Sequence, residues 1–326
     1  MATMDSETRT LGNTDIRISP VALGCWPISG MTSLDVNDAD SLQTLQAAVD
    51  HGVNFFDTAY FYGADGESER LIAQGLGHRR DEIVIATKGG LHWDADGKRV
   101  FDATARTLRR ECEESLRRLN TDRVELLYLH APDPNTPLSE SAAALRELMQ
   151  EGKTRCVGVS NLSLAQLKEF HAICPIAAFQ PAYNMLQRQI ERDTLPWCRE
   201  HRVAVVVYWP LLKGLLAGKL PRDHVFQPGD GRAKYPMFQG EEWQKNQDFV
   251  DQLREIARET GKTVAQVTVN WTIHQPGITS ALCGAKRADQ IVETSGAMGW
   301  RLDDSQLQKI DLALRQRGEP VSMLPV

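Results

Sequence analysis

Eight short apolar segments recur along the chain, separated by longer amphipathic segments. They cover Val21–Gly24, Asn54–Asp57, Ile83–Lys88, Val124–His130, Cys156–Ser160, Ala177–Gln180, Val203–Trp209 and Ser280–Cys283. Each is continuously apolar rather than alternating, which is typical of parallel strands buried on both faces. Eight strand–helix units predict an α/β fold whose parallel sheet closes into a (β/α)8 TIM barrel. Barrels of this length commonly form one domain, so we expect residues 1–326 to be a single domain.

The segments between the strands carry helical patterns. Ser41–Val49 places its apolar residues on one stripe, and Leu108–Leu119 combines leucines with many charged residues. Ser163 precedes the apolar segment Leu164–Phe170 and is followed three residues later by Gln166, which predicts a capping box at a helix start.

Two regions lie outside the eightfold pattern. Residues 8–20 predict an N-terminal β-hairpin that turns at Gly12–Asn13 and closes the floor of the barrel. The gap between the seventh and eighth strands is the longest and holds a stretch rich in Gly, Pro and charge, followed by helical stretches at Glu242–Thr260 and Thr263–Gln275. Long loops in compact domains usually cover a site, so we expect this insertion to be functional.

Bulk properties exclude several classes of partner. The net charge is −6 and no basic stripe is present, which argues against nucleic-acid binding. The N-terminus has no apolar signal region, and the longest apolar run, ended by Lys213, is too short for a bilayer, so no membrane insertion is expected. The six cysteines are scattered, which favours a reduced, cytoplasmic protein. The sequence does not indicate an oligomeric state.

Polar or aromatic residues close most of the predicted strands. They are Asp57, Lys88, His130, Ser160, Gln180, Tyr208 and Trp209. The carboxyl ends of barrel strands open on one rim, where the active sites of such barrels lie. We therefore expect these side chains to converge at the mouth of the barrel.

Reduction of a carbonyl group needs a hydride donor and a proton donor, and four residues near this rim could together supply the proton. Tyr62 would donate the proton, although a tyrosine is a weak acid with a pKa of about 10. The Lys88 ammonium would lower that pKa, and Asp57 would keep the lysine charged. His130 would hydrogen-bond the substrate oxygen. Taken singly, each residue has a simpler interpretation. Asp57 could cap a turn, Tyr62 could be a loop aromatic, Lys88 a solvated strand end and His130 a core histidine.

Seven ordered blocks resemble one known family. They are NFFDTAYFYGADGESERLIAQGL, VIATKGG, LLYLHAPDP, GKTRCVGVSNLSLAQL, FQPAYN, VVVYWPLLKGLLAGKL and GAKRADQIVETSGAM. In this order they resemble the aldo-keto reductases from about Leu11 to Arg315. The long segment after Leu220 is similar to the bacterial and potassium-channel-β-subunit-like branch.

The resemblance implies roles for the rim residues. Tyr62 is then the general acid, Lys88 and Asp57 tune it, and His130 positions the carbonyl. Ser160, Asn161 and Gln180 would bind the nicotinamide carboxamide, and Tyr208 would stack on the nicotinamide ring. Helix capping is the alternative for Ser160–Asn161, although Ser163 with Gln166 makes the better cap.

A second part of the chain is expected at the phosphate end of the cofactor. GAKRADQ follows the last strand and opens a helix, whose N-terminus is a ready anion site. Lys286 and Arg287 would suit a 2′-phosphate and favour NADP(H) over NAD(H), with a solvated basic turn as the alternative. By resemblance, Gln290 and Glu293 contact the adenine side. The stretch from Lys213 to Lys219 could wrap the pyrophosphate with Gly214, Leu215 and Lys219. The other residues expected at the cofactor are Leu211, Gly284 and Thr294.

Three departures from the family pattern stand out. Trp209 replaces a serine and either loses a pyrophosphate contact or forms a pocket wall, and packing inside the barrel is its simpler interpretation. Thr294 replaces an adenine-contacting asparagine. The tail GEPVSMLPV is short for a lid over the substrate.

The chain has no Walker A loop, no GxGxxG, no HExxH, no GxSxG and no visible metal-ligand set.

These observations predict an NADP(H)-dependent reductase of aldehydes and ketones, with NAD(H) retained as an alternative cofactor. Aromatic residues near the rim predict an apolar substrate pocket for aryl or medium aliphatic carbonyl compounds; they are Trp26, Tyr60, Trp93 and Trp209. One rival is an NADP(H)-binding redox sensor that regulates a partner protein with little turnover. A weaker rival is a barrel isomerase or lyase that needs no nicotinamide.

Overall fold

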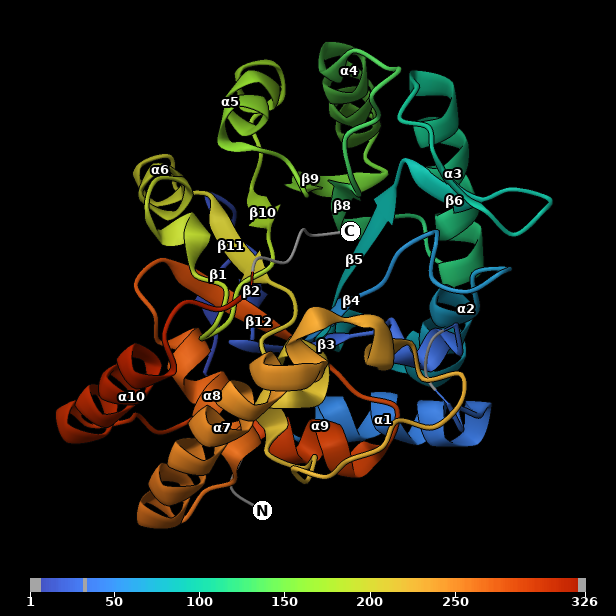
Figure 1. Cartoon of the computed structure of the whole chain (residues 1–326). Helices are drawn as coiled ribbons and strands as arrows, with labels where there is room; N and C mark the ends of the chain where they lie inside the picture. Colours follow the sequence, from blue (N-terminus) through green and yellow to red (C-terminus); the bar gives the residue numbers. More distant parts are fainter. Residues whose placement is uncertain (1–6, 32–33, 322–326) are drawn as a thin grey trace.

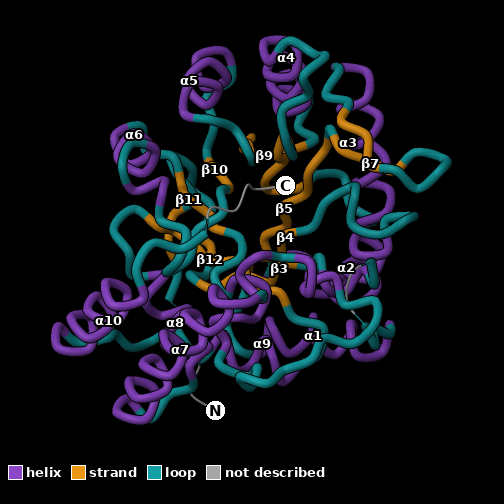
Figure 2. Tube along the Cα trace, in the orientation of Figure 1, coloured by secondary structure: helices purple, strands orange, loops and turns teal. Residues whose placement is uncertain are grey.

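The computed structural model describes residues 7–31 and 34–321, and eight parallel strands in it close into a barrel. Neighbouring strands follow the order β3-β4-β5-β8-β9-β10-β11-β12, and β12 pairs with β3 to complete the ring. Their bounds are β3 (Val21–Gly24), β4 (Phe55–Asp57), β5 (Val84–Gly89), β8 (Val124–Leu129), β9 (Thr154–Ser160), β10 (Ala178–Gln180), β11 (Ala204–Val207) and β12 (Ile278–Gly284). Each predicted strand has its counterpart, which confirms the predicted TIM barrel. Figures 1 and 2 show the strands at the centre and the helices around them.

The seventh strand is shorter than predicted. It ends at Val207, two residues before the predicted end at Trp209. Trp209 adopts a left-handed backbone with φ of 59°, which a regular strand cannot accommodate. Tyr208 keeps one isolated parallel bridge to Ala182. His130 likewise lies directly after its strand rather than within it.

Ten α-helices are found in the described residues. Their bounds are α1 (Asp38–Asp50), α2 (Glu67–Leu76), α3 (Ala105–Leu119), α4 (Leu138–Gln150), α5 (Leu164–Ile173), α6 (Thr194–Glu200), α7 (Gly240–Thr260), α8 (Val264–Ile273), α9 (Ala288–Ser295) and α10 (Asp304–Arg317). The predicted capping box of Ser163 and Gln166 starts α5. Short 3-10 turns are η1 (Pro27–Ser29), η2 (Gly77–Glu82), η3 (Gln189–Glu191), η4 (Leu212–Ala217), η5 (Gly231–Lys234) and η6 (Pro236–Phe238). None of the helices in the described ranges has the length and apolar character needed to cross a membrane.

The predicted N-terminal hairpin is present and consists of β1 (Arg9–Thr10) and β2 (Arg17–Ile18). Leu11 and Ile18 are fully buried in the same apolar cluster as the side chains that fill the barrel. Gly12 has φ of +59°, and a Cβ built there would lie 2.2 Å from the backbone oxygen of Ala177. Because Ala177 directly precedes β10, the hairpin closes the end of the barrel opposite the predicted site.

Two insertions interrupt the regular pattern. The predicted one, between β11 and β12, contains η4 to η6, α7 and α8. The other was not predicted: β6 (Leu91–Trp93) and β7 (Arg99–Phe101) form an antiparallel hairpin between β5 and α3. This second hairpin follows the carboxyl end of β5 and so lies on the same side of the barrel as the site.

Candidate active site

The structure brings the four predicted catalytic residues together. Asp57 ends β4, Lys88 lies near the end of β5, and Tyr62 lies in the loop after β4. The Lys88 Nζ donates to Asp57 Oδ1 at 2.5 Å, to the Thr58 carbonyl oxygen at 2.8 Å and to Tyr62 Oη at 3.1 Å. An ammonium has three N–H donors, so each of them has a partner. His130 is the fourth member, with its ring centroid 5.9 Å from that of Tyr62.

The Asp57–Lys88 ion pair is almost completely buried, with each side chain 1% exposed. Burial alone would lower the pKa of Lys88, but Asp57 and Tyr62 outweigh this effect, so that the pKa is raised. Burial raises the pKa of Asp57, while the charge of Lys88 and the hydrogen bonds from Lys88 and Gln180 oppose the rise. The lysine is therefore held as a cation against a buried carboxylate.

The pKa of Tyr62 differs from the sequence-based expectation. Burial raises it, the Lys88 ammonium lowers it, and the Asp57 charge raises it further. The net direction is upward, so Lys88 acts in the expected sense but does not overcome burial. Because Tyr62 Oη accepts the hydrogen bond from Lys88, its own proton is not used in that bond. Tyr62 is thus a protonated phenol at neutral pH with a proton to donate.

His130 is held as a neutral imidazole. Burial lowers its pKa well below the ordinary value, and the charges of Lys88 and Arg99 act in the same direction. Its Nδ1 is buried and has no hydrogen-bond partner among the described residues. A neutral imidazole offers one N–H donor, as a carbonyl oxygen requires.

The residues predicted at the nicotinamide are hydrogen-bonded to this group. Gln180 Nε2 donates to Asp57 Oδ2 at 2.7 Å, and Ser160 Oγ donates to the Gln180 carbonyl oxygen at 2.8 Å. Asn161 Nδ2 donates to the His130 carbonyl oxygen at 3.0 Å, and the Tyr208 hydroxyl donates to Asn161 Oδ1 at 2.8 Å. Amide and hydroxyl groups beside a half-buried aromatic ring fit the polar edge and flat face of a nicotinamide.

The residues predicted at the pyrophosphate and adenine are connected to one another. Lys219 Nζ lies 2.5 Å from Glu293 Oε2, so the two predicted contacts form an ion pair. Gln290 Oε1 accepts the backbone N–H of Lys286, and Thr294 Oγ1 donates to the Gln290 carbonyl oxygen. Thr294 is 4% exposed and its hydroxyl donates to carbonyl oxygens of its own helix, so it offers less to a ligand than an asparagine would.

The two basic residues predicted at the 2′-phosphate also have partners. Lys286 Nζ donates to the Leu34 carbonyl oxygen at 2.5 Å, and Arg287 Nε lies 3.5 Å from Asp289 Oδ1. Both lie at the start of α9, with Arg287 as its N-cap residue. Neither contact buries the charge: the Lys286 contact is exposed, and the side chains of Arg287 and Asp289 are 48% and 66% exposed.

The turn after β11 has an unusual backbone. Leu212, Lys213 and Gly214 have φ values of 44°, 56° and 90°. The Lys213 Nζ lies 4.0 Å from the Trp209 ring centroid and 4.5 Å from that of Tyr235. Trp209 therefore packs on a lysine that also contacts Tyr235, farther along the same insertion. Of the other predicted contacts here, Leu211 precedes η4, Leu215 lies within it, and Gly284 ends β12.

An aromatic wall borders Tyr62 and His130. Phe61 stacks on Trp93 at 4.1 Å between ring centroids and on Trp26 at 5.8 Å. The Trp93 indole N–H also donates to the Phe61 carbonyl oxygen at 3.0 Å. The rings of Tyr62 and His130 meet this wall edge-on. Phe61 was not predicted here, although its place directly before Tyr62 in an aromatic run was a usable signal.

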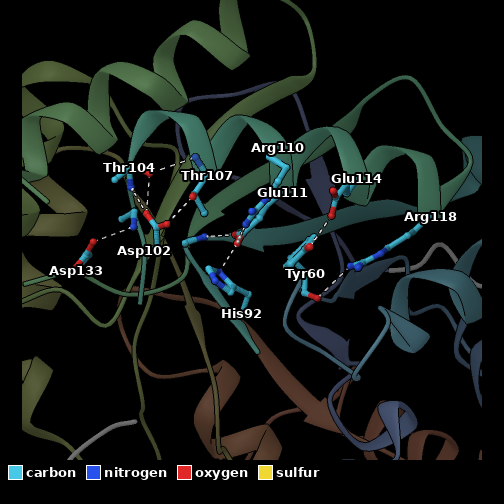
Figure 3. A network of polar contacts seen from close by, with 12 residues as sticks. Tyr60, His92, Asp102, Thr104, Thr107, Arg110, Glu111, Glu114, Arg118 and Asp133 are labelled. Atoms are coloured by element: carbon cyan, nitrogen blue, oxygen red, sulfur yellow. Dashed lines mark hydrogen bonds and ion pairs between the residues drawn. The ribbon is translucent and has the colours of Figure 1, made fainter. Parts of the chain in front are cut away.

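Tyr60 does not join this wall, in contrast to the sequence-based expectation. Its hydroxyl donates to Glu114 on α3 at 2.6 Å, and the Arg118 guanidinium lies 4.3 Å from its ring centroid (Figure 3). The side chain is thus held at helix α3, on the outer side of the loop. Tyr60 thus supports the loop that carries Tyr62.

Trp209, which was also predicted in the substrate pocket, lies with Tyr208 and Lys213.

Comparisons with known proteins identify the family of the chain. The model of the Aldo/keto reductase family matches residues 20–315. The aldo-keto reductase YhdN of Bacillus subtilis is 34% identical over 311 residues, covering 94% of this chain and 93% of its own. The NADH-specific methylglyoxal reductase of Escherichia coli is 32% identical over 310 residues, covering 90% and 94%. A probable voltage-gated potassium channel subunit beta of Arabidopsis thaliana is 33% identical over 308 residues, covering 89% and 90%.

A solved structure is similar over the whole fold. The glycerol dehydrogenase AKR11B4 from Gluconobacter oxydans superposes with a TM-score of 0.90 at 36% identity and covers 99% of both chains. The match therefore includes the barrel, the hairpins and the insertions as well as the strands that carry the site. The chain belongs to the aldo/keto reductase family.

Proposed function

We propose that this chain is an NADP(H)-dependent reductase that converts aldehydes and ketones into alcohols, with Tyr62 as the general acid. The observation that carries the proposal is the 3.1 Å contact between Lys88 Nζ and Tyr62 Oη, backed by the buried Asp57 carboxylate. A phenol that accepts a hydrogen bond from an ammonium is prepared for the negative charge it acquires on giving up its proton.

Each protein group has a distinct part in the reaction. A reduced nicotinamide held beside Gln180 and Tyr208 would supply a hydride to the carbonyl carbon. Tyr62 gives its proton to the carbonyl oxygen and becomes a phenolate, which the Lys88 ammonium stabilises. Asp57 keeps that ammonium charged before and after the transfer. The neutral imidazole of His130 donates a hydrogen bond to the same oxygen and orients it. Solvent then returns a proton to Tyr62.

The cofactor would lie across the rim of the barrel. Ser160, Asn161 and Gln180 would hold the carboxamide, and the Tyr208 ring would face the nicotinamide. At the other end, Lys286 and Arg287 would bind a 2′-phosphate at the start of α9, where the helix dipole also favours an anion. This basic pair supports NADPH as the preferred cofactor.

The substrate would lie against the aromatic wall. Trp26 and Trp93 are half-buried, stack on the buried Phe61 ring and offer apolar surface beside Tyr62 and His130. Such a surface favours aryl and medium aliphatic carbonyl compounds over small polar ones. The similar glycerol dehydrogenase suggests short polyols and their aldehydes as the competing substrate class.

A fluorescence titration of the purified chain with NADPH and with NADH tests the cofactor, and an aldehyde panel then tests the activity. We expect tighter binding of NADPH, and we expect the double variant Lys286→Ala/Arg287→Ala to weaken NADPH binding by roughly tenfold with little effect on NADH. The expected activity is oxidation of NADPH by 4-nitrobenzaldehyde faster than by glyceraldehyde. Equal effects of the double variant on both cofactors would contradict the assigned phosphate site.

The same panel separates the enzyme from the alternative, an NADP(H)-binding redox sensor for a partner protein. The similarity to a channel β subunit favours keeping this alternative. A sensor would copurify with bound cofactor and convert at most one equivalent of aldehyde before slow release limits it. Sustained turnover with excess NADPH supports the reductase.

A further inference from the structure

The unpredicted hairpin β6–β7 carries one part of the aromatic wall. Successive residues of a strand point to opposite faces, so neighbours on β6 have different surroundings. Trp93 stacks on Phe61 and donates to its carbonyl oxygen, on the side of Tyr62 and His130. His92 points the other way, toward helix α3 (Figure 3).

Helix α3 meets the hairpin through one buried carboxylate. Glu111 is fully buried, and its Oε1 accepts a hydrogen bond from His92 Nδ1 at 2.8 Å. Its Oε2 accepts the backbone N–H of Gly90 at 2.6 Å. Gly90 lies at the base of the hairpin, where its carbonyl oxygen accepts the backbone N–H of Asp102 at 3.2 Å. Glu111 thus contacts both the base and the first strand of the hairpin.

The buried Glu111 carboxylate needs these hydrogen bonds to offset the cost of burying its charge. A buried charge is costly unless it is paired and hydrogen-bonded. Apart from the hairpin donors, Glu111 has the guanidinium of Arg110, whose Nη2 lies at 3.4 Å and whose side chain is half exposed. Docking of the hairpin on α3 therefore compensates the buried charge of Glu111. The same docking holds β6, the strand that carries Trp93, in place beside the site.

We propose that His92 and Glu111 are positioning residues for substrate recognition, because they hold the β6–β7 hairpin so that Trp93 stays packed on Phe61 beside Tyr62 and His130. Neither side chain contacts the catalytic group. The proposal rests on the reductase function proposed above. It predicts that the pair governs the KM of substrates that contact the wall and leaves the chemical step unchanged.

The pair is also sensitive to pH. The hydrogen bond to Glu111 raises the pKa of His92, burial opposes the rise, and the charges of Glu111 and Asp102 favour it while Arg110 opposes it. The charged pair is therefore complete below this raised pKa. As the pH rises through it, the imidazole becomes neutral and the charge-assisted bond weakens to an ordinary hydrogen bond between a neutral donor and the carboxylate. The KM for a wall-contacting substrate should rise over that pH range.

Four proteins test the proposal: the wild type, His92→Ala, His92→Gln and Arg109→Gln. The glutamine keeps a neutral N–H donor for Glu111 but does not titrate. Arg109 lies on an exposed part of α3, pairs with Glu151 at the end of α4, and is the matched control. We measure kcat and KM for 4-nitrobenzaldehyde and for propanal from pH 6 to about 9, and hydrogen exchange of the backbone amides in residues 90–102.

We expect His92→Ala to raise the KM for 4-nitrobenzaldehyde roughly tenfold with kcat within about twofold, and to leave propanal nearly unchanged. His92→Gln should restore most of the affinity and remove its pH dependence, and Arg109→Gln should behave as wild type. Exchange in residues 90–102 should accelerate only in His92→Ala.

Unchanged exchange and KM in His92→Ala would overturn the proposal, as would an equal loss for both aldehydes. If the wild type reduced no carbonyl compound, the proposed function would be wrong. The exchange measurement would still show whether His92 and Glu111 hold the β6–β7 hairpin in place.

Discussion

At the scale of single residues, Lys88 has to be both buried and charged. It donates all three of its hydrogen bonds inside the protein, and one of them reaches the Tyr62 oxygen. Removing one partner of a buried ion pair leaves an uncompensated charge, which is more costly than removing both. The geometry of Tyr62 therefore depends on Asp57 through Lys88.

Asp57→Asn removes the charge opposite Lys88 and should lower the free energy of unfolding by about 3–5 kcal/mol. The double variant Asp57→Asn/Lys88→Met should be less unstable than the sum of the two single variants, because no unpaired charge remains. Urea unfolding of the three variants measures this coupling. Lys309→Gln, which breaks an exposed pair with Glu259, is the control and should change stability by no more than about 1 kcal/mol. If the losses of stability in Asp57→Asn and Lys88→Met simply added up in the double variant, the proposed coupling between the two buried charges would be contradicted.

At the scale of elements, the two β-hairpins show what a sequence pattern can reveal. The N-terminal hairpin was predicted from its turn at Gly12–Asn13. The β6–β7 hairpin was missed, although Asp96–Gly97 between two short apolar stretches is a recognised hairpin signal and Gly97 has φ of +72°. The seventh strand was predicted too long, because Trp209 continues the apolar run of the sequence although its backbone is left-handed and ends the strand.

The hairpin under the barrel should tolerate no side chain at Gly12. Gly12→Ala combines an unfavourable left-handed backbone with a close contact to the Ala177 backbone, so we expect a loss of about 1–3 kcal/mol in the free energy of unfolding. Gly77→Ala is the matched control, since a Cβ there meets nothing within 4 Å and the backbone is right-handed. Thermal or urea unfolding compares them. Equal stability of the two variants would show that the hairpin can shift without cost.

At the scale of the whole molecule, the eightfold strand pattern predicted the barrel and hence the common rim for Asp57, Lys88 and His130. It could not predict contacts between side chains far apart in the sequence. The Tyr60 hydroxyl meets Glu114 across 54 residues, and Lys219 meets Glu293 across 74. Such partners are chosen by the packed fold, so the position of Tyr60 outside the aromatic wall and the pairing of two predicted cofactor contacts emerged only from the structure.

The most direct measurement of the central claim compares Tyr62→Phe with the wild type, using steady-state reduction of 4-nitrobenzaldehyde and a parallel titration with NADPH. The phenylalanine keeps the ring against Trp26 and removes only the hydroxyl that Lys88 contacts. We predict that kcat/KM falls by about 100-fold or more while the Kd for NADPH stays within about twofold. Full activity of Tyr62→Phe with unchanged cofactor binding would contradict the assignment of Tyr62 as the proton donor.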